Sequence, residues 1–357
     1  MEFTAKIYNY EDRITNLSAE AVGVVKGEKH FPVFEGNKVF KPLTKSKPFS
    51  TPLFAYAEVF WSHVINEFFM PAPEYELAFC KGYEKQIEKY NDYGTVSPMI
   101  YGEGESLLNL LQFYRKYPDP KVNIDDYINY CMIFYDYSLI LGSEFFQSHR
   151  KIAEELAMQI LISILRGDQN YHYENVAFLC NKEENIVKMA PTIDHEFSSY
   201  FMFADNEKRH LFWLGKFLDS IQGTPIAEDK FAYVSTEKER KVLEASASNL
   251  HKNLVYIREY FTETTKVFLE KINCLKEALL KEPERFYLKP AVGYPDVANS
   301  DEFMIGMAKY KDCNEEKAKM YMEKYENAGK KIDFEVVSKR AVAEILTVIA
   351  MMQKILK

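Results

Sequence analysis

The spacing of apolar residues changes near residue 101, and this change constrains the fold more than any other feature of the sequence. Before that point the apolar residues form short runs bounded by glycine, proline and charged residues, a pattern typical of β-strands, at 21–26, 30–34, 38–43, 75–80 and 96–101. Residues 53–69 differ, because their apolar side chains recur at helical spacing. After residue 101 the runs are longer and have helical period, at 105–117, 124–141, 148–165, 209–221, 235–280, 313–326 and 334–357. The sequence therefore predicts a two-lobed α+β fold, with a small β-rich lobe over residues 1–101 and a large helical lobe over residues 102–357.

Length and charge narrow the class of protein. The 357 residues exceed the ~250–300 at which a single core stops growing, so a cleft between two lobes is expected. Forty-five basic residues against 53 acidic ones give a net charge of -8, which argues against nucleic acid as a partner. The apolar stretch 341–352 is too short to span a bilayer and contains Glu344, so no membrane span is predicted. Five scattered cysteines without a CxxC pair indicate a reducing, cytoplasmic setting.

Residues 166–194 gather polar side chains that could carry chemistry. Asp168, Asn170, His172 and Asn175 lie in one short stretch, and two apolar runs then predict a β-hairpin that leads to Asp194. Oxygen ligands from the asparagine at 175 and the aspartate at 194 would suit Mg²⁺, and a hairpin can bring the two together.

Two other interpretations of this stretch stay open. Asp and Asn also cap and turn the backbone where a helix ends, so the loop could be purely structural. Alternatively, Asp168, His172 and Asp194 could serve a metal-dependent phosphohydrolase, although no HxH or HExxH spacing supports one.

A lysine and a glutamate in the first lobe complete the residue types that phosphoryl transfer needs. Lys41 lies in the predicted strand 38–43, and Glu58 lies in the predicted helix that follows. A strand lysine held by a helix glutamate positions nucleotide phosphates in protein kinases. Each residue alone fits equally well as an ordinary solvent-facing side chain, so the interpretation depends on finding both together with the loop.

Together these residues resemble the HipA-like protein kinases, and among them most closely the compact CtkA-type bacterial Ser/Thr kinases. The catalytic loop of that family reads roughly GNxDxHxxN and is followed by a strand, a hairpin and the sequence AP-x-x-D. This chain has GDQNYHYEN, then VAFL, then APTID, so six positions agree in order: Gly167, His172, Asn175, Ala190, Pro191 and Asp194. KVFKP at 38–42 resembles the lysine strand of the family, and Glu58 resembles its helix glutamate. The resemblance extends over residues 20–200.

The resemblance implies a protein-kinase-like fold and an ATP-dependent phosphotransferase. Lys41, held by Glu58, would bind the phosphates of ATP in the cleft between the lobes. A hinge near Val96 to Met99 would offer backbone groups to the adenine. The phosphoacceptor would be a protein Ser or Thr, the chain itself in an autophosphorylation, or a small molecule.

In the loop, the resemblance assigns Mg²⁺ to Asn175 and Asp194 and a loop-stabilising role to His172. One departure concerns the catalytic base. The aspartate of the family lies five residues before the metal-binding asparagine, where this chain has Asn170, and aspartate stands at position 168 instead. An amide cannot accept a proton as a base. Either Asp168 reaches the acceptor hydroxyl, or the chain is a pseudokinase that binds nucleotide without efficient transfer.

Overall fold

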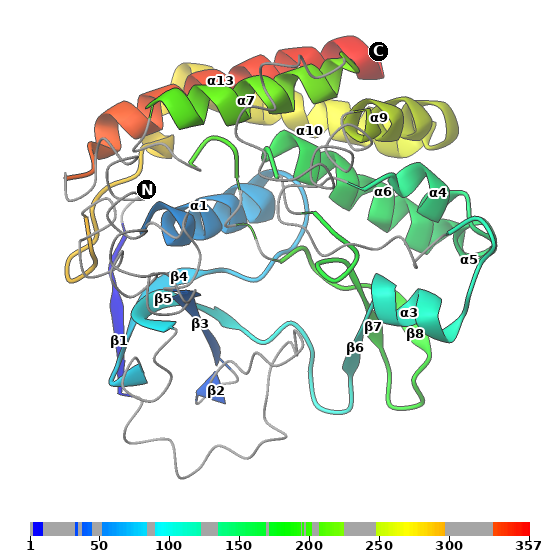
Figure 1. Cartoon of the computed structure of the whole chain (residues 1–357), viewed down its shortest axis with the longest axis horizontal. Helices are drawn as coiled ribbons and strands as arrows, with labels where there is room; N and C mark the ends of the chain where they lie inside the picture. The colour runs from blue at the N-terminus through cyan, green and yellow to red at the C-terminus, as the bar shows by residue number, and fades with distance from the viewer. Residues whose placement is uncertain are drawn as a thin grey trace, which may run out of the picture.

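The computed structural model describes the chain over residues 3–9, 33–34, 38–44, 52–83, 90–122, 135–168, 171–193, 195, 198–201, 207–224, 248–296 and 331–357. Two β-sheets lie on one side of the molecule and long helices on the other, with α1 (Pro52–Phe68) and α6 (Arg150–Leu165) between them (Figure 1). Along the chain, a small sheet with a buried helix precedes a larger helical part, which confirms the predicted two-lobed α+β fold. Within the described ranges, no helix is long and apolar enough to cross a membrane.

The first sheet has five strands in the order β1-β4-β5-β3-β2, and all neighbours are antiparallel except β1 and β4. The strands are β1 (Lys6–Asn9), β2 (Val33–Phe34), β3 (Lys38–Thr44), β4 (Glu76–Lys81) and β5 (Tyr90–Pro98). The predicted strands 38–43 and 75–80 are confirmed, whereas 21–26 lies outside the described residues.

The strand predicted at 96–101 is wrong in its bounds. β5 begins at Tyr90, inside a polar stretch, and ends at Pro98. It pairs with β3 on one side and β4 on the other. Backbone pairing on both sides outweighs the weak strand propensity of its Asn, Asp and Gly residues.

Helix α1 is buried on nearly every face and matches the helix predicted at 53–69. Even its polar residues Glu58 and Ser62 are buried. Such a helix is stable only where neighbours cover it all round. Strands β4 and β5 contact it, and so does α10 (Thr262–Lys281) of the helical part. Packing from the two sides therefore fixes the position of Glu58.

The second sheet contains the predicted hairpin and one strand that was not predicted. β6 (Ser106–Asn109), β7 (Ala177–Cys180) and β8 (Ile186–Met189) are antiparallel in that order, which confirms the β7–β8 hairpin. The helix predicted at 105–117 is wrong in its first turn, because residues 106–109 form β6 and α3 (Leu110–Lys116) begins after them. Asn109 ends the strand through a capping box. Its side chain accepts the N–H of Gln112 at 2.8 Å, and the Gln112 side chain accepts the N–H of Asn109 at 3.2 Å.

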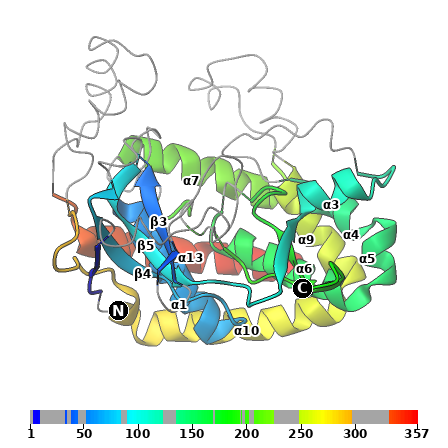
Figure 2. The same ribbon diagram turned by 90° about the horizontal axis from the view of Figure 1, so that it is seen from below.

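The other helices build the large lobe: α4 (Tyr137–Leu141), α5 (Glu144–Ser148), α7 (Glu207–Gln222), α9 (Asn249–Tyr260), the 3₁₀ helix η3 (Pro283–Phe286) and α13 (Phe334–Leu356). α10 and α13 pack on each other and on α6, and α13 runs behind both sheets (Figure 2).

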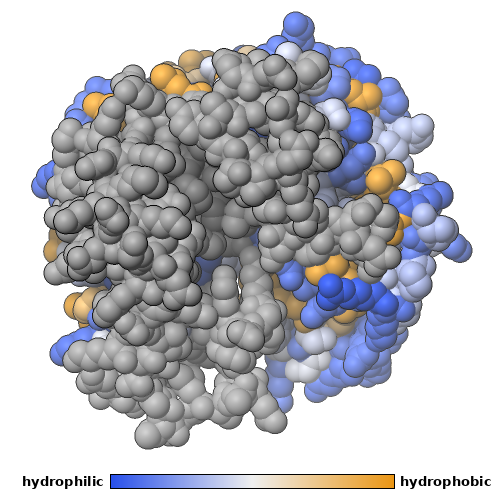
Figure 3. Space-filling model, in the orientation of Figure 1, coloured by the Kyte–Doolittle hydropathy of each residue, from blue (hydrophilic) through white to orange (hydrophobic). Residues whose placement is uncertain are grey.

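The helices predicted at 148–165, 209–221 and 334–357 are confirmed. The one predicted at 235–280 is described from residue 248 onward and divides at Phe261 into α9 and α10. The helix predicted at 313–326 and most of 124–141 lie outside the described residues. On the face in Figure 3, apolar residues of the described surface form small patches among polar ones.

Residues 287–296, after η3, tie the helical part back to the first sheet. The hydroxyl of Tyr294 donates to the carbonyl oxygen of Gly94 in β5 at 3.1 Å. The N–H of Ala291 donates to the hydroxyl of Tyr56 in α1 at 2.8 Å, and the rings of Tyr56 and Tyr294 pack edge to face with centroids 5.7 Å apart. One continuous core therefore joins the two parts of the chain. The predicted lobe boundary at residue 101 stays a prediction.

Replacing Tyr56 with Phe removes the acceptor for the Ala291 N–H and keeps the ring. A buried N–H without a partner costs ~1–3 kcal/mol, so we expect the free energy of unfolding in urea to fall by about that amount. Tyr260→Phe is the control, because Tyr260 is 56% exposed, and it should change stability by less than ~0.5 kcal/mol. An unchanged urea midpoint for Tyr56→Phe would show that the contact between residues 287–296 and α1 adds no stability.

Candidate functional site

Lys41 and Glu58, which were predicted to act together, form an ion pair. Lys41 lies in β3 and Glu58 in α1, and Nζ lies 2.7 Å from Oε2. The Glu58 side chain is 2% exposed and the Lys41 side chain 19%. A carboxylate this buried needs a cationic partner, and Lys41 supplies one. Gly94 of β5 permits the close strand pairing, since a Cβ there would collide with the carbonyl oxygen of Lys41.

The predicted hinge lies where the chain leaves the first sheet. Val96 of β5 is buried in a small core that also contains Phe40 of β3. Met99 is half-buried and follows the last residue of β5. The chain then continues to β6 of the second sheet. Val96 therefore lies in the last part of β5 and Met99 at the start of the connection between the sheets, and their contact with adenine stays a prediction.

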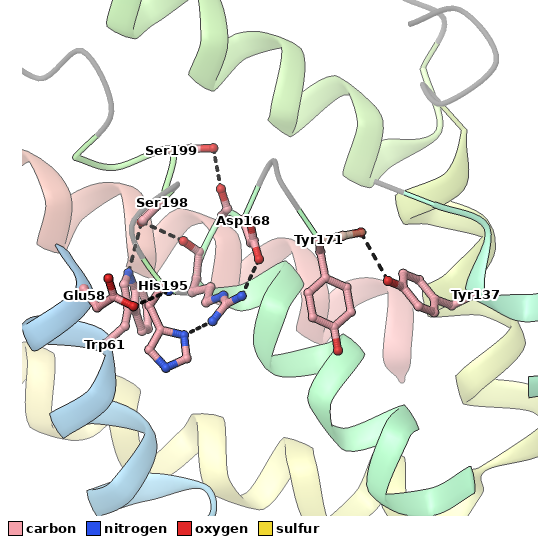
Figure 4. Close-up of polar contacts among 10 residues, drawn as sticks. Glu58, Trp61, Tyr137, Asp168, Tyr171, His195, Ser198 and Ser199 are labelled. Carbon is pink, nitrogen blue, oxygen red and sulfur yellow. Dashed lines mark hydrogen bonds and ion pairs between the residues drawn. The ribbon is translucent and has the colours of Figure 1, made fainter. Parts of the chain in front are cut away.

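The loop after α6 is held by residues 198–200 (Figure 4). The carbonyl oxygen of Gly167 accepts from the hydroxyl of Ser199 at 2.7 Å and from its N–H at 2.9 Å. The hydroxyl of Tyr200 donates to the carbonyl oxygen of Leu165 at 2.6 Å. Gly167 itself has φ of 66°, in the left-handed region that favours glycine. The turn out of α6 is thus fixed by both its own backbone and a second segment.

The carboxylate of Asp168 lies inside this loop and is paired with Arg166. The Arg166 guanidinium donates to Oδ2 of Asp168, and the two side chains are 1% and 2% exposed. The same guanidinium donates to Nδ1 of His195. The backbone N–H of His195 donates to Oε1 of Glu58 at 3.3 Å, so the loop is connected to the Lys41–Glu58 pair (Figure 4). These surroundings favour a role for Asp168 in positioning the loop, and its action on an acceptor hydroxyl stays a prediction.

His172 and Asn175 form a tight turn further along the loop. Nδ1 of His172 accepts the N–H of Glu174 at 3.2 Å, and the carbonyl oxygen of His172 accepts the N–H of Asn175 at 2.9 Å. A ring nitrogen that accepts is unprotonated, so the Glu174 carboxylate, 3.9 Å from the same nitrogen, makes no ion pair with this tautomer. The side chains of His172 and Asn175 are 3% and 4% exposed. The geometry favours the loop-stabilising role predicted for His172.

The β7–β8 hairpin brings the chain just before β7, where Asn175 lies, alongside the chain just after β8. The N–H of Ala190 donates to the carbonyl oxygen of Ala177 at 2.8 Å, which continues the ladder beyond the strands. Extending this antiparallel register places Asn175 opposite Thr192. Asn175 therefore lies beside the segment that leads directly to position 194.

Asn170 and Asp194 lie outside the described residues, so the Mg²⁺ pair of Asn175 and Asp194 stays a prediction. Among the residues that the structure describes, no group of three or more His, Cys, Asp and Glu side chains is placed to hold a metal ion. The alternative phosphohydrolase needs Asp168 as a ligand. The Arg166 guanidinium already binds that carboxylate, which argues against this alternative.

Four residues of this arrangement were not predicted as site residues: Arg166, His195, Trp61 and Ser198. Nε1 of Trp61 donates to the hydroxyl of Ser198 at 3.0 Å, and that hydroxyl donates to the carbonyl oxygen of Arg166 at 2.7 Å. The sequence holds one weak signal, a charged residue directly after the apolar helix 150–165, and this pattern usually marks only a helix end. Their long-range partners are 29 to 137 positions away in the chain, which no local pattern reveals.

Comparison with known proteins gives a distant likeness to a solved structure. No protein-family model matches the chain, and no curated protein matches it. Among solved structures, the crystal structure of a Helicobacter pylori proinflammatory kinase, CtkA, is similar with a TM-score of 0.40 and 14% sequence identity, covering 89% of this chain and 98% of that chain. Because the TM-score and the identity are this low, a function for this chain must be argued from its own residues.

Replacing Gly167 with Ala tests how tightly the loop is held. A Cβ at this position would lie 3.1 Å from Cβ of Ser199 and 3.2 Å from Cζ of Tyr200. Gly293→Ala is the matched control, because Gly293 has φ of 79° but a Cβ there would meet nothing within 4 Å. Both variants bear the left-handed penalty of ~1–2 kcal/mol, and Gly167→Ala adds ~1–3 kcal/mol of overpacking. The free energy of unfolding in urea should fall further for Gly167→Ala than for Gly293→Ala. An equal fall in both variants would mean that residues 198–200 do not confine the loop.

Proposed function

We propose that this protein is an ATP-dependent phosphotransferase, a kinase that uses Mg-ATP. The observation that carries the proposal is the buried chain of contacts that runs from Lys41 through Glu58 to the loop at Asp168. It connects a partly exposed cation on a strand to a loop whose sequence resembles a kinase catalytic loop. Phosphoryl transfer depends mainly on holding such groups in fixed relative positions.

Lys41 binds the phosphates of ATP in this proposal. The Lys41 side chain is 19% exposed, and it is held by Glu58, whose side chain is 2% exposed. The buried glutamate therefore holds the lysine in one place. A hydrogen bond from an ammonium to a phosphate is among the stronger polar contacts in proteins. Burial of Glu58 between the sheet and α10 prevents the pair from drifting as nucleotide enters and leaves.

Asn175 and Asp194 hold Mg²⁺ in the same site. Both offer the hard oxygen donors that this ion prefers. Bound Mg²⁺ neutralises charge on the transferring phosphate. Helix α6 holds the hairpin next to the two proposed ligands, because Nε2 of Gln159 in α6 donates to the carbonyl oxygen of Ala190 at 2.7 Å.

The acceptor hydroxyl belongs to a protein Ser or Thr, to the chain itself or to a small molecule. Asp168 is paired with the buried Arg166, so it orients the loop and does not take the proton. Asn170 stands at the spacing of the family's base, and an amide can orient a hydroxyl but cannot deprotonate it. Transfer therefore relies on positioning and electrostatic stabilisation, and it is slow.

The same observation favours a second candidate, a pseudokinase that binds Mg-ATP and transfers no phosphate. The two candidates share the Lys41–Glu58 pair and differ only in turnover. Nucleotide binding and phosphate transfer must therefore be measured separately.

Lys41→Met tests nucleotide binding. Loss of a charged hydrogen bond of ~1.5–3 kcal/mol should weaken Mg-ATP binding by roughly 10- to 150-fold, measured by calorimetry. Lys116→Met is the control, because Lys116 forms an exposed pair with Glu184 at 3.0 Å, and it should leave the Kd unchanged. An unchanged Kd for Lys41→Met, with wild-type affinity in the control, would rule out the phosphate-binding role.

Asn170→Asp tests the position of the base. If position 170 faces the acceptor hydroxyl, a carboxylate there should raise the rate of phosphate transfer on the order of 10²-fold and leave the Kd for Mg-ATP unchanged. Asp168→Asn is the comparison, and it should lower thermal stability because it leaves the Arg166 guanidinium without its anion. Two results together would instead identify Asp168 as the base. Asn170→Asp would leave the rate of phosphate transfer unchanged, and Asp168→Asn would abolish transfer without lowering thermal stability.

A further inference from the structure

The side chain of Arg166 connects two segments that the proposed function uses. Its guanidinium contacts Asp168 in the loop and Nδ1 of His195, the residue after Asp194. It also lies over the ring of Tyr171, with Cζ 5.9 Å from the ring centroid. The residue is fully buried. A guanidinium without solvent must be satisfied by protein groups, so these contacts hold it at one place.

Hydrogen bonds also join α1 to the backbone of Arg166. Trp61 of α1 donates to Ser198, and Ser198 donates to the carbonyl oxygen of Arg166. Glu58, one turn earlier in α1, accepts the N–H of His195. Helix α1 is therefore attached to Arg166 twice, once through the carbonyl oxygen and once through the guanidinium.

The geometry of the guanidinium explains why arginine occupies this position. It has several N–H donors in a fixed plane, and here two different nitrogens donate, Nη1 to His195 and Nη2 to Asp168. Because His195 accepts at Nδ1, its ring is neutral and carries its proton on Nε2. A lysine can pair with Asp168, but its single ammonium cannot reproduce the two diverging contacts.

We propose that Arg166 is a positioning residue that holds His195, the residue after Asp194 in the sequence, against the Asp168 loop and thereby controls how strongly Mg²⁺ promotes ATP binding. This inference rests on the proposed Mg-ATP site. Arg166 touches neither nucleotide nor metal in it. It acts by holding His195, and so the chain on which the proposed metal ligand lies, against Glu58 and the loop.

The test compares ATP binding with and without Mg²⁺ in wild type and in Arg166→Lys. Metal-free ATP affinity depends on Lys41, so it should stay within about 3-fold of wild type. The tightening of ATP binding by Mg²⁺ should fall roughly 10- to 100-fold, the usual effect of removing a contact that orients a metal ligand. Arg258→Lys is the matched control, because Arg258 donates to the carbonyl oxygen of Ile355 in the helical part, and it should keep the full Mg²⁺ effect.

His195→Phe is a second variant that keeps the Arg166–Asp168 pair and the ring that packs on Tyr75. It removes both ring nitrogens, among them the Nδ1 that accepts from Arg166, and should reduce the Mg²⁺ effect in the same direction, so the test holds even if Arg166→Lys does not fold. A full Mg²⁺ effect in His195→Phe and in any folded Arg166→Lys would overturn this inference and leave the proposed function intact. Failure of the wild type to bind ATP at all would overturn the proposed function, and this inference with it.

Discussion

A charged side chain with no access to water needs partners, and the arrangement of this molecule around Arg166 follows from that need. Asp168 supplies the opposite charge, His195 supplies a ring acceptor, and the end of α6 supplies the position. Asp168 lies two residues away in the same loop, whereas His195 lies 29 positions away, so the guanidinium joins the end of α6 and its loop to the segment after the hairpin. Removing any one of them would leave a buried charge or donor unpaired, which costs several kcal/mol.

Helix α1 gives this cluster a rigid support. It is covered by the first sheet on one side and by α10 on another, and residues 287–296 bind it near Tyr56. Because the helix cannot move without disrupting that packing, the carboxylate of Glu58 stays where it holds both Lys41 and the N–H of His195. A site whose polar groups sit on packed elements keeps its geometry better than one built on loops alone.

The buried Arg166 gives a physical reason for the aspartate at position 168, where the family that the chain resembles has asparagine. A carboxylate three residues after the end of α6 lies within reach of the Arg166 guanidinium, and the ion pair fixes the turn at Gly167. The anion that a kinase would use as a base is thereby used to stabilise the loop. In the proposed kinase, turnover would then depend on how well the remaining groups orient the acceptor, because phosphoryl transfer needs little covalent assistance from the protein.

The sequence by itself determined the elements whose patterns are local. Helical spacing located α1, α6 and α13, and alternation of apolar runs with turns located β3, β4 and the β7–β8 hairpin. The pairing of Lys41 with Glu58 was also predicted, from the resemblance to the strand lysine and helix glutamate of protein kinases, and the two side chains form that contact at 2.7 Å.

Only the tertiary structure decided the course of β5, the start of β6 and the partners of Arg166. Strands β5 and β6 form where neighbouring strands pair with their backbones, which overrides the preferences of their own polar or helix-like residues. Contacts with His195 and Ser198 join positions far apart in the chain, and they are made by Arg166, Trp61 and Glu58. A buried polar side chain can be a helix cap or the centre of a site, depending on which distant groups pack against it. The spacing of apolar residues along the sequence does not reveal those distant contacts.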